Sequence, residues 1–502
     1  MTQRRTIVIT AGLMLSLFLV SMESTVVSTA MPTIVSQLGG LEAYSWVFTA
    51  FMLASTTTVP LYGKLSDLYG RRPVYAVAMV IFLLGSVLCG TARSMPQLIA
   101  FRTIQGIGGG GLLPLVFIII GDLFTLEQRA RLQGLFSSVW GVSSILGPLL
   151  GGFLVDQVSW RWIFLINLPL APLAMGLVWW AWVDKRRDAG AARPSVDYLG
   201  AVLLTAGAVL LLLGLSDLRA PWAWGVLLGA LLLFIALVWV ERRAVDPVLP
   251  TGLFRERMFS VACGHGILAG CAMFGSTAFV PLFVQGVLGT SATEAGAALA
   301  PMMLSWVFAS IIGTRLLLRV GYRSLALAGM TSLTTGALLL TQVSEEAGRL
   351  PLMVYLGMMG LGMGLSIPAF LLAVQTSVER SKLGTATSTL QFSRSIGGAL
   401  GTGVMGVVLS AGLASSLVAA GLDPASVPLD GLLEGGGGAA VSEAMRAALS
   451  AGTRNVFVVA AAAAALGLAV TFLAPRGRIG DLESRRAASE EPAAPQPAAS
   501  GE

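Results

Sequence analysis

Residues 133–152, QGLFSSVWGVSSILGPLLGG, have a counterpart 250 residues later in residues 383–402, LGTATSTLQFSRSIGGALGT. A second stretch, QGIGGGGLLP at 105–114, overlays MGLGMGLSIP at 359–368 with an offset of 254. The aligned pairs are Gly134/Gly384, Gly147/Gly397, Gly151/Gly401, Gly106/Gly360, Gly108/Gly362, Gly110/Gly364 and Pro114/Pro368. This repeat predicts two matching halves of six helices each, with further helices inserted between them.

The composition of the chain excludes a soluble domain. The 502 residues are 55% hydrophobic and only 12% charged, and the mean hydropathy is +0.81. A soluble domain carries about 25% charged residues. Apolar runs of roughly 20 residues recur along the chain, and each can cross about 30 Å of hydrocarbon as a helix. We therefore expect an all-α, multi-pass protein of the inner or plasma membrane of a bacterium.

The apolar runs divide the chain into spans and loops. Fourteen spans are predicted, at 7–31, 45–66, 74–92, 97–119, 133–155, 162–183, 197–216, 222–240, 259–285, 293–316, 324–341, 351–374, 384–411 and 454–474. With the N-terminus inside, 24 of the 32 Lys and Arg residues fall in inner loops and tails and six fall outside. This asymmetry predicts that both termini are cytoplasmic. The first run also resembles a signal peptide, but equally apolar runs follow, so we expect it to be a span.

The spans group into four regions. Residues 1–190 form the first six-helix bundle, 191–257 hold two inserted helices, and 258–475 form the second bundle. Within the second bundle, 412–452 is expected to be an outer loop with room for a short interfacial helix or hairpin. The charged, proline-rich tail at 476–502 is expected to be disordered.

Several kinds of site are not indicated. Three cysteines and one histidine, all in apolar segments, support neither a disulfide framework nor a metal site. Gly106-x-Gly108-x-x-Gly111 spells a dinucleotide fingerprint, but it lies in a membrane span and not in a βαβ unit. Glycines in such a span let helices pack closely. We expect no enzyme activity, no cofactor, no nucleotide and no nucleic acid.

A few polar residues lie inside the spans. LFLVSMESTVVSTAMP at 17–32 places Glu23 in the first span, 18 residues past Arg5 and so about 27 Å along a helix. A charge at this depth costs several kcal/mol unless it faces protein or water. Arg394, in the span at 384–411, would pair with a carboxylate across the halves or with backbone carbonyls. His265 is expected to be a packing residue rather than a proton relay.

The inner loop between the second and third spans has an unusual pattern. In GKLSDLYGRR (63–72), Gly63 and Gly70 permit a tight turn, and Asp67 precedes Arg71 and Arg72. A solvated basic loop is the alternative interpretation. The spacing resembles the signature loop of the major facilitator superfamily.

Four other stretches resemble the fourteen-span drug:proton antiporter-2 family of that superfamily. They are MESTVVSTAMP (22–32), LIAFRTIQGIGGGG (98–111), SILGPLLGG (144–152) and WRWIFLINLP (160–169). Two departures stand out. Glu23 replaces the usual aspartate of the first-helix motif, and GTRLLLRVGYR (313–323) in the second half has no acidic counterpart of Asp67.

The resemblance implies the major facilitator fold and proton-coupled export by alternating access. It implies that Glu23 carries the coupling proton in a water-reachable cleft and that Arg102 tunes or relays that proton. For Glu23 the alternative is a static hydrogen-bond network, and for Arg102 it is a side chain that snorkels to the interface. Gln105 and Asn167 are further candidate buried polar residues.

The resemblance also assigns roles to two other motifs. Asp67 would cap the helix that begins near Gly384 when the inner gate is shut. Gly147, Pro148, Gly151 and Gly152 form the antiporter motif, which would bend the fifth span and pack it against a helix of the other half. A generic kink is the alternative.

The expected cargo is a small lipophilic compound. Few buried acids exist besides Glu23, so a monocation or a neutral molecule fits better than a polycation. The expected partners are protons and the lipid bilayer, and the expected state is a monomer. A dedicated exporter of one metabolite, self-made antibiotic or lipid is an alternative within the same fold. A non-transporting membrane sensor or scaffold is an alternative of another class.

Overall fold

The structure, a computed structural model, describes residues 3–39, 44–182, 197–216, 220–244, 247, 249, 252–289, 292–343, 348–419, 439–478 and 480. Within these residues every regular element is a helix. Ten helices of the described part are long and apolar enough to cross a membrane, and a shorter apolar helix covers Leu199–Leu215. The all-α membrane class predicted from composition is confirmed.

Each of the fourteen predicted ranges falls on these helices. The first half contains α1 (Gln3–Leu38), α2 (Tyr44–Tyr69), α3 (Arg71–Thr91), α4 (Met95–Leu123), α5 (Leu126–Gln157), α6 (Trp162–Leu165) and α7 (Asn167–Ala181). The insertion contains α8 (Tyr198–Ser216) and α9 (Ala223–Glu241). The second half contains η2 (Leu253–Arg255), α10 (Arg257–Gly286), α11 (Ala292–Val320), α12 (Tyr322–Leu340), α13 (Arg349–Ser377), η4 (Arg380–Lys382), α14 (Leu383–Ala419) and α16 (Ala439–Phe472).

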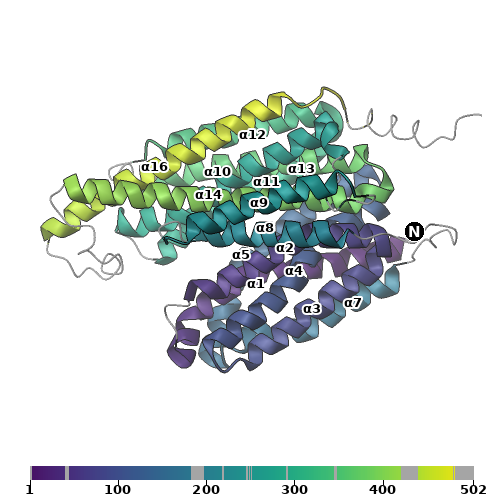
Figure 1. Cartoon of the computed structure of the whole chain (residues 1–502), viewed down its shortest axis with the longest axis horizontal. Helices are drawn as coiled ribbons and strands as arrows, with labels where there is room; N and C mark the ends of the chain where they lie inside the picture. The colour runs from purple at the N-terminus through teal and green to yellow at the C-terminus, as the bar shows by residue number, and fades with distance from the viewer. Residues whose placement is uncertain are drawn as a thin grey trace, which may run out of the picture.

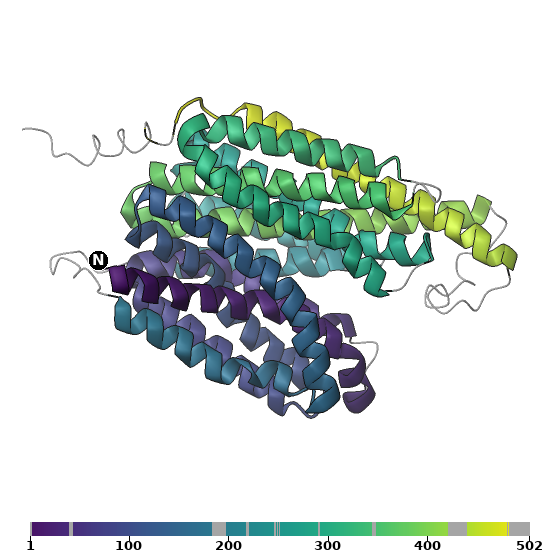
Figure 2. The same cartoon turned by 180° about the vertical axis from the view of Figure 1, so that it is seen from behind.

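The sequence repeat has a counterpart in the packing. In the first half, α1 packs on α5 and α7, and both α2 and α3 pack on α4. In the second half, α10 packs on α14 and α16, and both α11 and α12 pack on α13. Figures 1 and 2 show the two groups of helices in contact near the N-terminus of the chain and diverging toward the opposite end.

Glycines of the repeat set the helix spacing inside each half. A Cβ on Gly106 would overlap the backbone of α2, and one on Gly108 the backbone of α3. Gly360 meets α11 and Gly362 meets α12 in the same way. The segment that spells a dinucleotide fingerprint therefore serves close helix packing, as its position in a span predicts.

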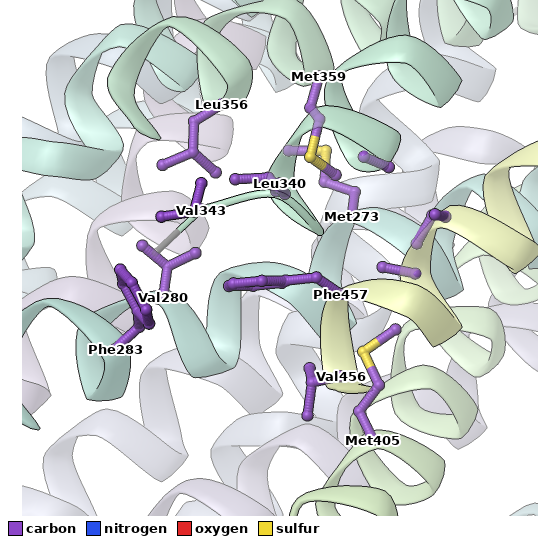
Figure 3. Close-up of a cluster of buried hydrophobic side chains, with 14 of the residues drawn as sticks. Met273, Val280, Phe283, Leu340, Val343, Leu356, Met359, Met405, Val456 and Phe457 are labelled. Atoms are coloured by element: carbon purple, nitrogen blue, oxygen red, sulfur yellow. The ribbon is translucent and has the colours of Figure 1, made fainter. Parts of the chain in front are cut away.

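The core of the second half is filled by apolar side chains. Met273, Leu340, Leu356, Met359 and Phe457, all buried, converge there from α10, α12, α13 and α16 (Figure 3). Such a core is stabilised by close packing and by removal of surface from lipid contact rather than by polar bonds.

The inserted pair lies against the seam between the halves. Helix α8 packs on α9 and also contacts α2 of the first half and α14 of the second. Its Ala208 and Leu212 share a buried cluster with Ile396 and Ala399 of α14 and with Leu53 of α2. The halves meet along two seams, one between α2 and α14 and one between α5 and α11. The insertion therefore touches both halves along the first of these seams.

Helices α14 and α16 are longer than expected. They contain 37 and 34 residues, or about 55 and 51 Å at 1.5 Å per residue, against about 30 Å of hydrocarbon. Figure 1 shows both extending beyond their neighbours. The outer-loop prediction for 412–452 is therefore wrong at both ends, because alanine-rich sequence continues each helix. Residues 420–438 and most of the predicted tail, 481–502, lie outside the described residues.

Candidate functional site

A buried ion pair lies in the middle of the first half. Nη1 of Arg102, on α4, is 2.5 Å from Oε1 of Glu23, on α1. The two residues are only 1% and 2% exposed. Arg102 therefore does not snorkel to the interface, and that alternative is excluded.

Three polar side chains, of Gln105, Ser86 and Asn167, complete the site. We call the ion pair and these three residues the Glu23 cluster. Gln105 accepts from Arg102 Nη1 at 2.7 Å and donates to the Ser86 hydroxyl at 2.8 Å. Asn167 donates to Glu23 Oε2 at 3.2 Å and to Ser86 Oγ at 3.1 Å. Of the five, Ser86 was not predicted, because one serine in an apolar run carries no distinguishing signal.

The guanidinium of Arg102 is held on its other sides as well. Its Nε donates to the backbone carbonyl of Val47 at 3.2 Å, and its Cζ lies 4.2 Å from the ring centroid of Phe51 and 5.9 Å from that of Phe164. An arginine over an aromatic face gains cation–π attraction. Helices α1, α2, α3, α4, α6 and α7 thus all contribute to holding the pair.

Local sequence explains why these helices can meet. A Cβ on Gly85 of α3 would overlap the backbone of Gln105, so glycine there lets α3 and α4 approach closely. Asn167 is the first residue of α7, just after α6 ends at Leu165. The interruption places an amide, which both donates and accepts, beside the carboxyl of Glu23.

The Glu23 carboxyl does not face open space. Glu23 is only 2% exposed and is not among the lining residues of the cavities described here. The water-reachable cleft stays a prediction for the transport cycle. Arg102 supplies the compensating charge from within the same bundle, and this compensation reduces the cost of burial.

A second polar group closes the seam between α2 and α14. Asp67, near the C-terminal end of α2, accepts from the backbone N–H of Gly384 at 3.0 Å and from the N–H and hydroxyl of Thr385, both at 2.7 Å. Arg71 Nη1 lies 2.6 Å from the same carboxylate. The predicted cap near Gly384 is confirmed, and a carboxylate is favourable at a helix N-terminus.

The glycines of this loop act in two different ways. Gly63 lies against Ser388 and Gly384 of α14, where any side chain would overlap them. Gly70 has a φ of 93°, a conformation that favours glycine, and it separates α2 from α3. Close approach and a sharp reversal are therefore both encoded by the motif.

The two arginines of the loop have different partners. Arg71 donates to the carbonyl of Ser66 at 2.6 Å and to that of Arg380, in the second half, at 3.2 Å. Arg72 donates to the carbonyl of Trp179 at 2.9 Å, and its Cζ lies 3.9 Å from the Trp179 ring centroid. Arg71 therefore takes part in the contact between halves, whereas Arg72 anchors α3 to α7.

The second seam, between α5 and α11, has no charged group in the contacts described for it. A Cβ on Gly134 would meet Ile311 at 2.9 Å. One turn on, the hydroxyls of Ser137 and Ser310 are 2.7 Å apart. Gly134 and Gly384, aligned by the repeat, thus occupy corresponding places on the two seams.

The antiporter motif lies further along α5 than Gly134 and Ser137. Gly147 and Gly151 are buried, but nothing lies within 4 Å of a Cβ built on Gly152. The apolar residues around them pack with those of α1. The packing of this motif on a helix of the other half stays a prediction. Pro148 lies in α5, and its side chain is outside the description.

A small cavity of about 50 Å³ lies between the halves. Its lining includes Gln133 of α5, His265 of α10 and Arg394 of α14. Arg394 donates to the side-chain oxygen of Gln391 at 2.6 Å. No carboxylate of the described residues pairs with Arg394, so the expected ionic or backbone partner is corrected to a side-chain amide. The ring centroid of His265 lies 4.7 Å from that of Phe370, as a packing histidine would.

The sequence is similar to that of known membrane transporters. The profile described as "Major Facilitator Superfamily" matches residues 13–402. The chain belongs to this superfamily. The Multidrug transporter protein MdtP of Bacillus subtilis (strain 168) is 41% identical over 414 residues, which cover 81% of this chain and 76% of that protein.

Two further relatives extend the comparison. Multidrug resistance protein 3 of the same bacterium is 37% identical over 412 residues, 81% of this chain and 80% of that protein. An "Acurin A biosynthesis cluster MFS-type transporter" of Aspergillus aculeatus is 30% identical over 488 residues, 92% and 88% of the two chains. These similarities identify a non-enzymatic, multi-pass membrane transporter.

Solved structures agree on the fold. The human organic anion transporter MFSD10 superposes with a TM-score of 0.65 at 17% identity, covering 94% of this chain and 100% of that one. The proton:xylose symporter XylE superposes with a TM-score of 0.62 at 14% identity, covering 97% and 100%. At these identities the likeness shows the major facilitator fold alone.

Proposed function

We propose that this transporter exports small lipophilic compounds in exchange for protons, by alternating access. We assign it to the fourteen-span drug:proton antiporter-2 family, as a monomer with both termini cytoplasmic. The motifs at 22–32, 63–72, 98–111 and 144–152 support the assignment, as do the two Bacillus relatives with multidrug names.

The observation that carries the proposal is the buried Glu23–Arg102 pair. A carboxyl inside a membrane bundle is costly and is a functional site by default. Protonation of Glu23 would cancel its attraction for Arg102, so that each proton bound or released changes the force that joins α1 to α4. Gln105 and Asn167 would hold the two side chains in position. Because the carboxyl is enclosed in this conformation, proton exchange requires another conformation of the cycle.

The inner seam supplies the second element of the mechanism. Contacts of Asp67, Arg71 and Gly63 hold the inner ends of α2 and α14 together in this structure, and Gly70 makes the turn into α3. We infer that these contacts form the closed inner gate and separate when the cargo enters from the cytoplasm. Alternating access needs such a contact to be broken and remade in every cycle.

The breadth of the cargo separates the proposal from its closest alternative. Multidrug relatives favour several lipophilic cargoes, whereas the relative from a biosynthesis cluster favours one metabolite. Of the two charge classes expected from sequence, neutral and monocationic, the cation at Arg394 beside the cavity between the halves disfavours the monocationic class. Resistance of cells to a panel of dyes and drugs, against resistance to one compound only, distinguishes the two alternatives.

Flux through purified protein in liposomes tests the function directly. With an imposed pH gradient, wild-type protein should move a lipophilic dye uphill, and Glu23→Gln should abolish uphill flux while dye binding persists. Glu294→Gln, which removes a carboxyl from an exposed pair with Arg349, is the matched control. Normal pumping by Glu23→Gln would refute the coupling assignment, and no flux of any compound would favour a sensor or scaffold.

A further inference from the structure

The cavity between the halves has a one-sided charge. Its lining comes from α4 and α5 of the first half and from α10, α13 and α14 of the second. Arg394 is the ionised residue of that lining, which contains no Asp or Glu. Glu23 cannot serve as its counter-ion, because Arg102 already pairs with Glu23 inside the first bundle.

The hydrogen-bonding capacity at this cavity is not used up by the protein. A guanidinium carries five N–H donors, and the contact described for Arg394 uses Nη2 toward Gln391. His265, only 2% exposed, has an Nε2 atom without a hydrogen-bond partner among the described residues. Two polar groups thus remain available on the second half, and a cavity joins them.

The rest of the lining is mostly apolar. Phe117, Ile367, Phe370 and Leu390 surround the polar end. A space of about 50 Å³ is enough for a few water molecules, each needing roughly 10–15 Å³, or for one small polar group of a larger molecule. The geometry suits an amphiphile whose polar end reaches Arg394 while its body lies against the aromatic and aliphatic walls once the halves separate.

We infer that this cavity is a subsite for an anionic group, a carboxylate of a lipophilic cargo, bound by Arg394 with His265 as a second hydrogen-bonding group. Arginine binds carboxylates through two parallel hydrogen bonds, which a neutral or cationic cargo cannot accept in the same way. The inference rests on the proposed transport function, because it narrows the cargo of that transporter to lipophilic acids.

Three fluorescent probes with one lipophilic body test this assignment. Pyrenebutyrate, pyrenebutanol and a pyrenebutyl-trimethylammonium salt differ only in their polar end. Binding of each to the full-length protein in lipid nanodiscs, corrected with empty nanodiscs, requires no pH gradient. Wild-type protein should bind the carboxylate at least tenfold more tightly than the alcohol, and the cation most weakly.

Substitutions then locate the preference. Arg394→Met should weaken carboxylate binding about 10- to 100-fold, the range expected for a hydrogen-bonded charged group, and change alcohol binding by no more than about twofold. Arg394→Lys keeps the charge without the planar fork and should fall between the two. Arg349→Met removes an arginine from an exposed pair and should leave all three affinities unchanged.

The outcomes separate this inference from the function on which it rests. Equal affinity for the three probes in wild-type protein, or a carboxylate preference that persists in Arg394→Met, would overturn the subsite even if dyes are still pumped. If the three probes bind equally and chloride competes with them, the cavity is an inorganic anion site. That result would also overturn the carboxylate subsite. Carboxylate preference without uphill flux would leave the subsite standing and remove the export mechanism.

Discussion

The two halves share one packing scheme and differ in what they bury. The offset of 254 residues aligns Arg102 with Leu356. It likewise aligns Gln105 with Met359. In the first half these positions belong to the Glu23 cluster, whereas in the second they lie in the apolar core of Figure 3. Because apolar side chains fill the same place in the second half, the fold does not require the ion pair. Its presence therefore points to a function.

The two seams differ in the same sense. Glycines at corresponding positions bring α14 against α2 and α5 against α11. The first seam adds the Asp67 carboxylate at the start of α14, whereas the second adds a bond between the hydroxyls of Ser137 and Ser310. Among the described residues, the buried ion pair therefore lies in the first half, and the carboxylate that caps α14 comes from the loop of that half.

The largest effect on stability is expected when substitutions make the first half resemble the second. Arg102→Leu leaves the Glu23 carboxyl buried without its partner, and removing one member of a buried pair costs about 3–5 kcal/mol. We expect a large loss of stability in detergent unfolding experiments. Glu23→Leu combined with Arg102→Leu should recover most of that stability while uphill flux stays absent. A double variant as unstable as the single one would show that Arg102 acts mainly through Val47 and Phe51.

Both halves use glycines at close helix contacts, and substitution of these glycines should have an intermediate effect on stability. Gly108→Ala and Gly362→Ala each place a methyl group against the backbone of a neighbouring helix. Overpacking of this kind costs about 1–3 kcal/mol, so both variants should unfold earlier by similar amounts. Gly152→Ala is the control, since its methyl group meets no atom within 4 Å. A large difference between Gly108→Ala and Gly362→Ala would break the structural equivalence of the halves.

Much of the fold was readable from the sequence, because hydropathy, charge asymmetry and the glycine repeat are one-dimensional signals. The pairing of Asp67 with Gly384 follows from the resemblance of the loop to the superfamily signature, together with the favourable position of an acid at a helix N-terminus. The ends of α14 and α16 were missed because alanine-rich, partly polar sequence forms helix without raising hydropathy.

The details of the sites were less predictable. Spacing gives the depth of a residue in a span but not the helix that its side chain faces. For this reason the sequence does not predict that Arg394 binds the side-chain amide of Gln391. The enclosure of the Glu23–Arg102 pair depends on five helices besides α1, and no single stretch of sequence records that arrangement.

Weakening the seams one at a time should give a smaller effect and shows whether they are equivalent. Asp67→Asn keeps the size of the side chain but removes its charge from the start of α14, where a cap contributes about 0.5–2 kcal/mol. The inner ends should separate more often, seen as longer distances between spin labels on the inner ends of α2 and α14. Ser310→Ala at the other seam should shift these distances less. An equal shift in both variants would contradict the special role of Asp67.

The smallest effect is expected at the surface, and it tests whether burial rather than charge pairing makes the Glu23 cluster important. Arg349 and Glu294 are 2.6 Å apart, against 2.5 Å for Arg102 and Glu23, but their side chains are 43% and 42% exposed. Exposed pairs contribute about 0–1 kcal/mol, because water screens them and the side chains lose freedom. Arg349→Met should therefore leave unfolding and flux nearly unchanged. A loss as large as that of Arg102→Leu would mean that pairing alone, irrespective of depth, accounts for the cost.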